Sequence, residues 1–203
     1  NDALKALSEK RGRKPERAVS DISFDIPKLK QNHKNELYAR FINGNNLPEN
    51  ISELSGIILP LEAEIPDNLP KNIKLIAEMP RWIEKEIDFT NKGFTHALCG
   101  NLAGIELAKK AGLKIIASNF LNTLNDFSFL ALEDLGCEEI ILSAETEAKD
   151  IPFIKNSVKK GIFAYGRLPL MLMKNCPLKN GRSCKECDKK GFITDRTNTD
   201  FPI

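Results

Sequence analysis

The sequence has few of the features that usually indicate a function. It contains no apolar run near ~20 residues, so no membrane span is expected. Its amino-terminal stretch lacks the apolar core of a signal peptide, which makes the cytoplasm the expected location. A net charge of +2 is too small to indicate a nucleic-acid or membrane partner by itself.

Reactive side chains are also scarce. Only two histidines are present, His33 and His96, and no serine–histidine–aspartate or cysteine–histidine nucleophile set is visible. His96 lies in an apolar run, which favours a packed core histidine over a catalytic base. No glycine-rich loop of the dinucleotide-binding or phosphate-binding type follows an expected strand. This absence argues against a nucleotide-binding open sheet.

The bulk composition is that of a globular domain. The chain has 203 residues, with 41% hydrophobic and 29% charged residues, which is enough for one domain with a real core. Residues 1–34 are expected to form a short helix and a linker arm, and residues 35–203 the main domain. Because the chain begins at Asn1 without a methionine, a preceding domain of a longer chain is expected as its partner.

From residue 35 a serial pattern of strands and helices begins. The expected strands are short, nearly continuous apolar runs, typical of parallel strands buried on both faces. Their starts are roughly 20–25 residues apart, the length of a strand plus a crossover helix. The runs are Leu37–Ile42, Ile57–Leu61, Ile73–Ala77, Phe94–Leu98, Lys114–Ala117, Ile140–Leu142 and Ile162–Tyr165.

Apolar stripes at helical spacing predict the helices between these strands, each ended by a glycine. The stripes are Leu102, Ile105 and Ala108 before Gly112; Leu124, Phe127 and Ala131 before Gly136; and Ile151, Ile154 and Val158 before Gly161. The sequence therefore predicts an α/β fold, a TIM-barrel-like β/α repeat with seven or eight mostly parallel strands. About 170 residues is short for a full eight-fold barrel, so a small or incomplete barrel is expected.

Polar residues follow the expected strands, at the end where β/α barrels build their active sites. The candidate substrate-binding residues are Asn101, Asn122, Asn125, Ser143, Glu145 and Arg167. Asparagine and serine are also common helix N-caps, so Asn101, Asn122 and Ser143 could be caps alone. A mutual ion pair would similarly account for Glu145 and Arg167.

Three cysteines near the C-terminus form the strongest chemical signal. Cys176, Cys184 and Cys187 have the spacing C-x7-C-x2-C within a polar loop, residues 174–190. A Cys-x-x-Cys step can direct two thiolates at one tetrahedral ion, which makes zinc the first candidate and an iron–sulfur cluster the second. A structural zinc usually has four protein ligands; the fourth could be Cys99, Cys137, Asp188, Asp195, a partner chain or water. Reduced thiols or a disulfide remain alternatives.

Six stretches of the chain resemble the collagenase-like peptidase family (type U, number thirty-two). They are Ser118–Asn125, Leu142–Glu145, Tyr165–Met171, Asn175–Pro177, and Thr194–Arg196 with Phe201–Pro202. The resemblance covers about residues 35–203 and implies a TIM-barrel-like domain of a bacterial, cytoplasmic protein. Some members are labelled peptidases or collagenases; others hydroxylate an RNA base or act in making ubiquinone, with an iron–sulfur cluster held by four cysteines. The family's four-cysteine block is absent here, so neither its cluster ligands nor its presumed peptidase residues carry over, whereas Asn122, Asn125, Ser143, Glu145 and Arg167 do.

Three functional hypotheses follow. The first is the C-terminal domain of a collagenase-like peptidase-family protein with hydrolase activity and a peptide substrate. The second is an RNA-binding or RNA-hydroxylation accessory domain with a metal centre. Its basic surface would come from Lys10–Arg17, a stretch that a solvated linker also explains, and from Lys174, Lys179, Arg182 and Lys185. The third is a non-catalytic structural or interaction domain braced by the cysteine loop.

Overall fold

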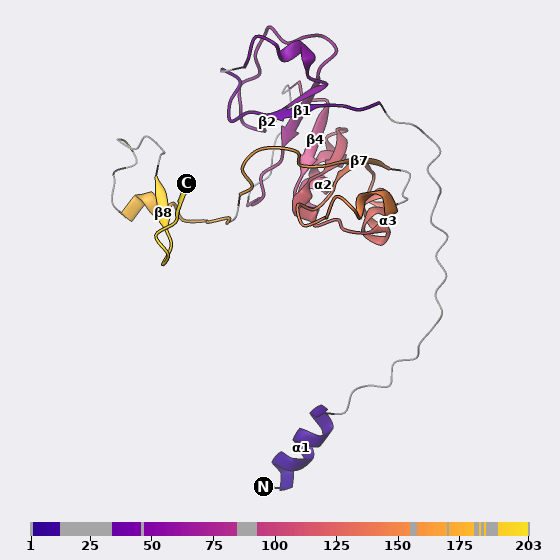
Figure 1. Ribbon diagram of the computed structural model, residues 1–203, viewed down its shortest axis with the longest axis vertical. Helices are drawn as coiled ribbons and strands as arrows, with labels where there is room; N and C mark the ends of the chain where they lie inside the picture. The colour runs from indigo at the N-terminus through magenta and orange to yellow at the C-terminus, as the bar shows by residue number, and fades with distance from the viewer. Residues whose placement is uncertain are drawn as a thin grey trace.

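The described part of the chain forms a curled parallel sheet with two covering helices (Figure 1). The computed structural model describes residues 2–12, 34–45, 47–84, 93–154, 158–169, 171–180, 183, 185 and 191–202. The seven strands are β1 (Tyr38–Arg40), β2 (Gly56–Pro60), β3 (Lys74–Glu78), β4 (His96–Cys99), β5 (Lys114–Ala117), β6 (Cys137–Ile141) and β7 (Lys159–Gly161). They pair in sequence order and every pair is parallel, which confirms the predicted TIM-barrel-like fold in an incomplete form.

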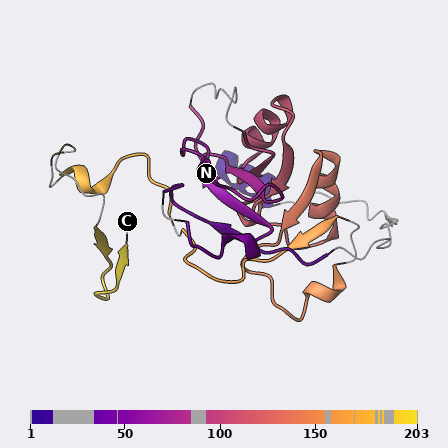
Figure 2. The same ribbon diagram turned by 90° about the horizontal axis from the view of Figure 1, so that it is seen from above.

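Two helices cover one face of the sheet. These are α2 (Leu102–Lys110) and α3 (Asp126–Asp134), which lie together on the outside of the curve in Figure 2. Ile105 and Ala108 of α2 and Phe129 and Leu132 of α3 are buried in the main core. Gly112 and Gly136 follow the helices with φ of +70° and +85°, so the predicted left-handed helix ends are confirmed.

Several shorter elements complete the fold. A free-standing helix, α1 (Asp2–Gly12), buries none of its residues. Four 3-10 turns are η1 (Ile51–Glu53), η2 (Asn119–Leu121), η3 (Ile151–Phe153) and η4 (Pro177–Asn180). The antiparallel pair β8 (Phe192–Thr194) and β9 (Asp200–Pro202) was not predicted from the sequence. No helix among the described residues is long and apolar enough to cross a membrane.

Three details of the sequence prediction were wrong. The last strand lies at β7, before the apolar run Ile162–Tyr165, because Lys159 faces the sheet interior and hides the strand's pattern. In the predicted helix over Ile151–Val158, the described residues form the turn η3, with Pro152 in it, and the chain is extended at Ile154; Gly161 belongs to β7. The buried face of α3 carries Phe129 and Leu132, whereas Phe127 is 51% exposed.

The concave face of the sheet has an apolar centre and a charged amino end. Ile58, Ile76, Leu98 and Ile116, one from each of four adjacent strands, form the centre. The amino end holds a group that we call the amino-end charge cluster: Glu36, Tyr38, Lys74, Glu139 and Lys159. Its members come from β1, β3, β6, β7 and the residues just before β1. Side chains from the first and last strands therefore meet across the interior, which shows how strongly the sheet curls.

The amino-end charge cluster satisfies its own charges. Lys74 Nζ lies 2.6 Å from Glu139 Oε1, 2.8 Å from Glu36 Oε2 and 2.8 Å from Tyr38 Oη. Tyr38 Oη donates to Glu139 Oε2 at 2.7 Å. Lys159 bridges Glu36 and Glu139, the latter at 3.2 Å. Two carboxylates balance two ammonium groups, so the cluster is neutral. Burial, followed by the hydrogen bond to Glu139, raises the pKa of Tyr38, and burial lowers the pKa of Lys159.

Removing one carboxylate from this cluster should destabilise the fold. We expect Glu139→Ala to lower the free energy of unfolding by about 2–4 kcal/mol, because both lysines lose a half-buried partner. Urea denaturation of both proteins measures the change. The neighbouring Glu138 provides a matched control, since its one ion pair among the described residues is with Lys114 at 3.4 Å and its side chain is 56% exposed. Glu138→Ala should change stability by less than about 0.5 kcal/mol; equal losses in the two variants would contradict this role of the cluster.

Candidate ligand-binding site at the carboxyl rim of the sheet

Charged and polar side chains meet at the carboxyl ends of the strands, which we call the carboxyl rim. Arg40 ends β1 and Glu78 ends β3, and their side chains form an ion pair with Nε and Oε2 2.7 Å apart. Arg40 is 52% exposed and Glu78 23% exposed. This pair joins the first and third strands at the end of the barrel where ligands usually bind.

Arg81 lies just beyond β3 and is held in place from two sides. Its guanidinium carbon is 3.9 Å from the centre of the Phe120 ring, a cation–π contact. Its carbonyl accepts a hydrogen bond from Asn101 Nδ2 at 3.0 Å, and the same amide donates to Pro80 O at 3.1 Å. Over the described ranges no carboxylate forms an ion pair with Arg81. The positive charge is thus oriented by a ring and a backbone clamp, without an acidic partner.

A small depression sits between these groups. It is lined by Glu78, Met79, Arg81, Leu98, Gly100, Ser118 and Phe120. Its volume is about 10 Å³, close to the room that one water molecule needs. Opposite charges from Glu78 and Arg81 border an apolar floor, so the depression suits a small group with both hydrogen-bond donor and acceptor character.

Two of the predicted substrate-binding residues are helix caps. Asn101 accepts from Gly104 N at 2.7 Å and caps α2. Asn125 accepts from Ser128 N at 3.1 Å, and Ser128 Oγ accepts in return from Asn125 N, so the two residues form a capping box at α3. The capping alternative therefore accounts for the polarity of Asn101 and extends to Asn125.

Of the remaining candidates, Asn122 and Ser143 are hydrogen-bonded to each other at a corner of the rim, whereas Glu145 and Arg167 are exposed. Ser143 Oγ donates to Asn122 Oδ1 at 2.7 Å, which joins the loops after β5 and β6. Glu145 and Arg167 are both exposed and form no ion pair with each other. Their role in binding stays a prediction.

The corner after β5 and β6 has unmet hydrogen-bonding capacity. The hydroxyls of Thr123 and Thr146 are buried and have no hydrogen-bond partner in the part of the chain that the structure describes. Thr123 is fully buried, and its carbonyl accepts from Ser143 N at 3.0 Å. Polar groups enclosed in this way normally bind another polar group or an ordered water.

Sequence reasoning missed Arg40, Gly100 and Phe120. Arg40 was hidden inside the expected run Leu37–Ile42, although it is the one charged residue of that run. Side chains alternate along β1, so Arg40 lies on the same face of the sheet as Tyr38, and this spacing could have indicated which face the Arg40 side chain occupies. The role of Phe120 could not be predicted from the sequence, because it depends on a contact with Arg81, which is distant in the chain.

His96 lies away from the rim. It begins β4, so about four residues, or ~13 Å of strand, separate it from Gly100. Burial, followed by the charge of Lys74, lowers its pKa, and its Nδ1 is 2.8 Å from Thr95 Oγ1. The interpretation as a packed histidine agrees with this half-buried place beside the amino-end charge cluster.

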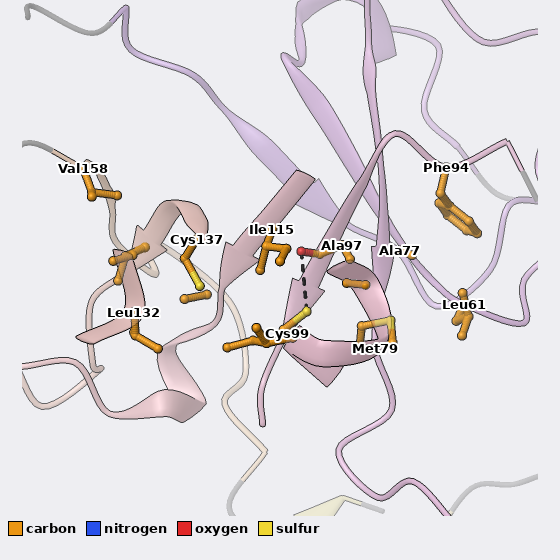
Figure 3. Packing of buried hydrophobic residues seen from close by; sticks show 14 of the residues in the cluster. Leu61, Ala77, Met79, Phe94, Ala97, Cys99, Ile115, Leu132, Cys137 and Val158 are labelled. Atoms are coloured by element: carbon orange, nitrogen blue, oxygen red, sulfur yellow. Dashed lines mark hydrogen bonds between the residues drawn. The ribbon is translucent and has the colours of Figure 1, made fainter. Parts of the chain in front are cut away.

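The cysteines have different surroundings. Cys99 and Cys137 lie within the packed core between sheet and helices (Figure 3), 0% and 4% exposed. Burial raises the pKa of Cys99 from 9.0 to about 12 and that of Cys137 from 9.0 to about 11. Such enclosed neutral thiols are poor metal ligands and poor nucleophiles. Cys176 is exposed, whereas Cys184 and Cys187 lie outside the described residues.

The metal prediction is therefore not tested by the structure. Within the described ranges no three histidine, cysteine, aspartate or glutamate side chains come together in a way that could hold a metal ion. Asp195, one suggested fourth ligand, instead accepts hydrogen bonds from Thr197 N at 2.7 Å and Thr199 N at 2.9 Å in the turn before β9. These bonds, led by the one from Thr199, lower the pKa of Asp195.

Comparison with known proteins adds no relative. No family model, curated protein or solved structure matches the chain, so the family resemblance rests on the sequence motifs alone.

The buried thiols give a pH-dependent prediction. Because folding holds Cys99 and Cys137 in the neutral form, the stability that they contribute is complete below pH 9.0 and is lost as the pH rises toward about 11 and 12.

We expect native alkylation at pH 8 to modify Cys176 while sparing both core thiols, with mass spectrometry of peptides as the measurement. Alkylation in denaturant is the control and should modify all five cysteines of the chain. Fast labelling of Cys99 in the native protein would contradict the buried placement.

The cysteine spacing predicts bound metal in the C-terminal loop. We expect elemental analysis of protein purified without chelator to find about one zinc per chain. Cys184→Ser with Cys187→Ser should remove it, because both substitutions eliminate thiolate ligands. Cys137→Ala, which deletes a core thiol, should retain the metal. A wild-type chain free of zinc and iron would refute the metal site.

Proposed function

We propose that this chain is the C-terminal barrel domain of a collagenase-like peptidase-family protein, and that its carboxyl rim binds a peptide. The parallel half-barrel supports the proposal, because the family resemblance implies this fold. The segments Tyr165–Met171 and Asn175–Pro177 carry the most specific part of that resemblance.

One observation carries the choice of a peptide. Glu78 and Arg81 line the same depression with opposite charges, and Ser118 adds a hydroxyl. A peptide presents a donor N–H and an acceptor C=O close together, so its C=O can accept from Arg81 while its N–H donates to Glu78, which also pairs with Arg40. A uniformly anionic polymer would meet Glu78 as a repulsive neighbour.

The proposal assigns binding to this domain. Its described thiols in the core are neutral, and His96 lies at the opposite end of β4 from the rim. We propose that hydrolysis belongs to a partner domain and not to this one. The helix α1 supports a partner of that kind, since Leu4 and Leu7 are 70% and 46% exposed and none of its residues is buried.

An RNA ligand is the second candidate, and a specific observation favours it. Trp82 is 58% exposed, and Lys174 Nζ lies 5.6 Å from the centre of its ring. Exposed aromatic rings beside cations are typical of surfaces that stack single-stranded bases. Lys174 is, however, already paired with Glu84 at 2.6 Å, which reduces the free positive charge there.

Trp82 also provides the test, because it is the sole tryptophan of the chain and directly follows Arg81. We expect collagen-derived peptides to change its fluorescence on titration, and Glu78→Gln with Phe120→Ala to weaken binding about tenfold or more. Lys109→Ala, on the exposed side of α2, should bind as the wild type does. A salt-sensitive response to short RNA without any response to peptides would favour the second candidate; no response to either would remove the rim as a binding site.

A further inference from the structure

Arg81 has the properties of a group prepared for an anion. The side-chain amide of Asn101, the residue that also caps α2, donates to the carbonyls of Pro80 and Arg81 and so fixes the backbone there. Its guanidinium rests on Phe120 at 3.9 Å. An arginine stacked in this way loses little further freedom when it forms hydrogen bonds, because its planar fork is already oriented.

Among the described residues, no carboxylate pairs with Arg81. Glu78 is the carboxylate that shares its depression, and Glu78 Oε2 is engaged by Arg40 at 2.7 Å. Across the described ranges, the Arg81 side chain forms neither an ion pair nor a hydrogen bond. By contrast, both lysines of the amino-end charge cluster are paired within the cluster. The rim cation is thus left available where the interior cations are neutralised.

We propose that Arg81 anchors a carboxylate of the ligand, and that this carboxylate is the C-terminus of a peptide. The inference rests on the proposed peptide-binding function and names the part of the peptide that the depression takes. A carboxylate matches the guanidinium fork with two parallel hydrogen bonds. The backbone N–H next to a C-terminal carboxylate can donate a hydrogen bond to Glu78.

Charge favours a carboxylate over a phosphate. The depression has room for about 10 Å³, close to that of one water molecule, so size does not separate the two groups. A phosphate carrying up to two negative charges would lie beside Glu78, with Arg81 as its one unpaired cation among the lining residues. A singly charged carboxylate avoids most of that repulsion.

Chemically matched ligands test the inference on the whole 203-residue chain. An acetylated tripeptide with a free C-terminal carboxylate is compared with the same peptide as its C-terminal amide. Trp82 fluorescence gives the affinities, and the NMR signal of the Arg81 side-chain Nε–H reports the contact. We expect the free acid to bind roughly 10- to 100-fold tighter than the amide, and to shift the Arg81 signal.

Two substitutions locate the effect. In Arg81→Ala the acid-to-amide ratio should fall to about one, and in Arg81→Lys it should lie between that value and the wild-type ratio, because an ammonium keeps the charge but loses the fork. Circular dichroism checks the folding of both variants, and Arg81→Lys serves alone where the alanine variant does not fold. Lys109→Ala is the matched control and should retain the wild-type ratio.

The outcomes separate this inference from the proposed function. If acid and amide bind equally, or if the preference persists in both Arg81 variants, the carboxylate anchor is wrong while peptide binding stands. If inorganic phosphate or a short RNA shifts the Arg81 signal and the acid does not, the ligand class is wrong. If neither peptide changes either signal, both proposals fail.

Discussion

The neutral charge cluster at the amino end of the barrel is the constraint on which the rest of the structure depends. Among the residues that the structure describes, β1 and β7 are the edges of the seven-stranded sheet, and no strand there joins them to close the cylinder. Glu36, Tyr38 and Lys159 instead connect these edges through side chains. Charges withdrawn from water are tolerated only when each finds a partner, and the cluster meets that condition with two carboxylates, two ammonium groups and one phenol.

Fixing the curl at one end arranges the groups at the other. Because parallel strands share one direction, curling the amino ends brings Arg40 within reach of Glu78 across β2. The apolar centre of Ile58, Ile76, Leu98 and Ile116 separates the two charged ends. Charges at the amino end satisfy one another. At the rim, as far as the structure describes it, an arginine has no acidic partner and two buried threonine hydroxyls have no hydrogen-bond partner. The rim is therefore the candidate binding site.

Much of the fold was predictable because it depends on local signals. Buried parallel strands are continuous apolar runs, and six of the seven predicted runs overlap the observed strands. Glycines after α2 and α3 marked the helix ends, since left-handed backbone suits glycine. The predicted position of the seventh strand was wrong because β7 depends on contacts with residues far away in the sequence. Lys159 lies in the interior because it pairs with Glu36 and Glu139. A lysine pair in sequence gives no hint of that partnership.

The site was less predictable, because residue type at a strand end does not separate capping from binding. Asn101 shows why the distinction is incomplete. Its side-chain oxygen caps α2 through Gly104 N, while its amide nitrogen holds the carbonyls of Pro80 and Arg81. One asparagine thus fixes the start of a helix and the position of the neighbouring arginine. Arg81 in turn is oriented by Phe120, which reaches the site from the loop after β5. The geometry of the rim consequently depends on Asn101, a residue whose own hydrogen bonds are all structural. If the rim binds a peptide as proposed, a substitution of Asn101 would weaken binding although Asn101 does not contact the ligand.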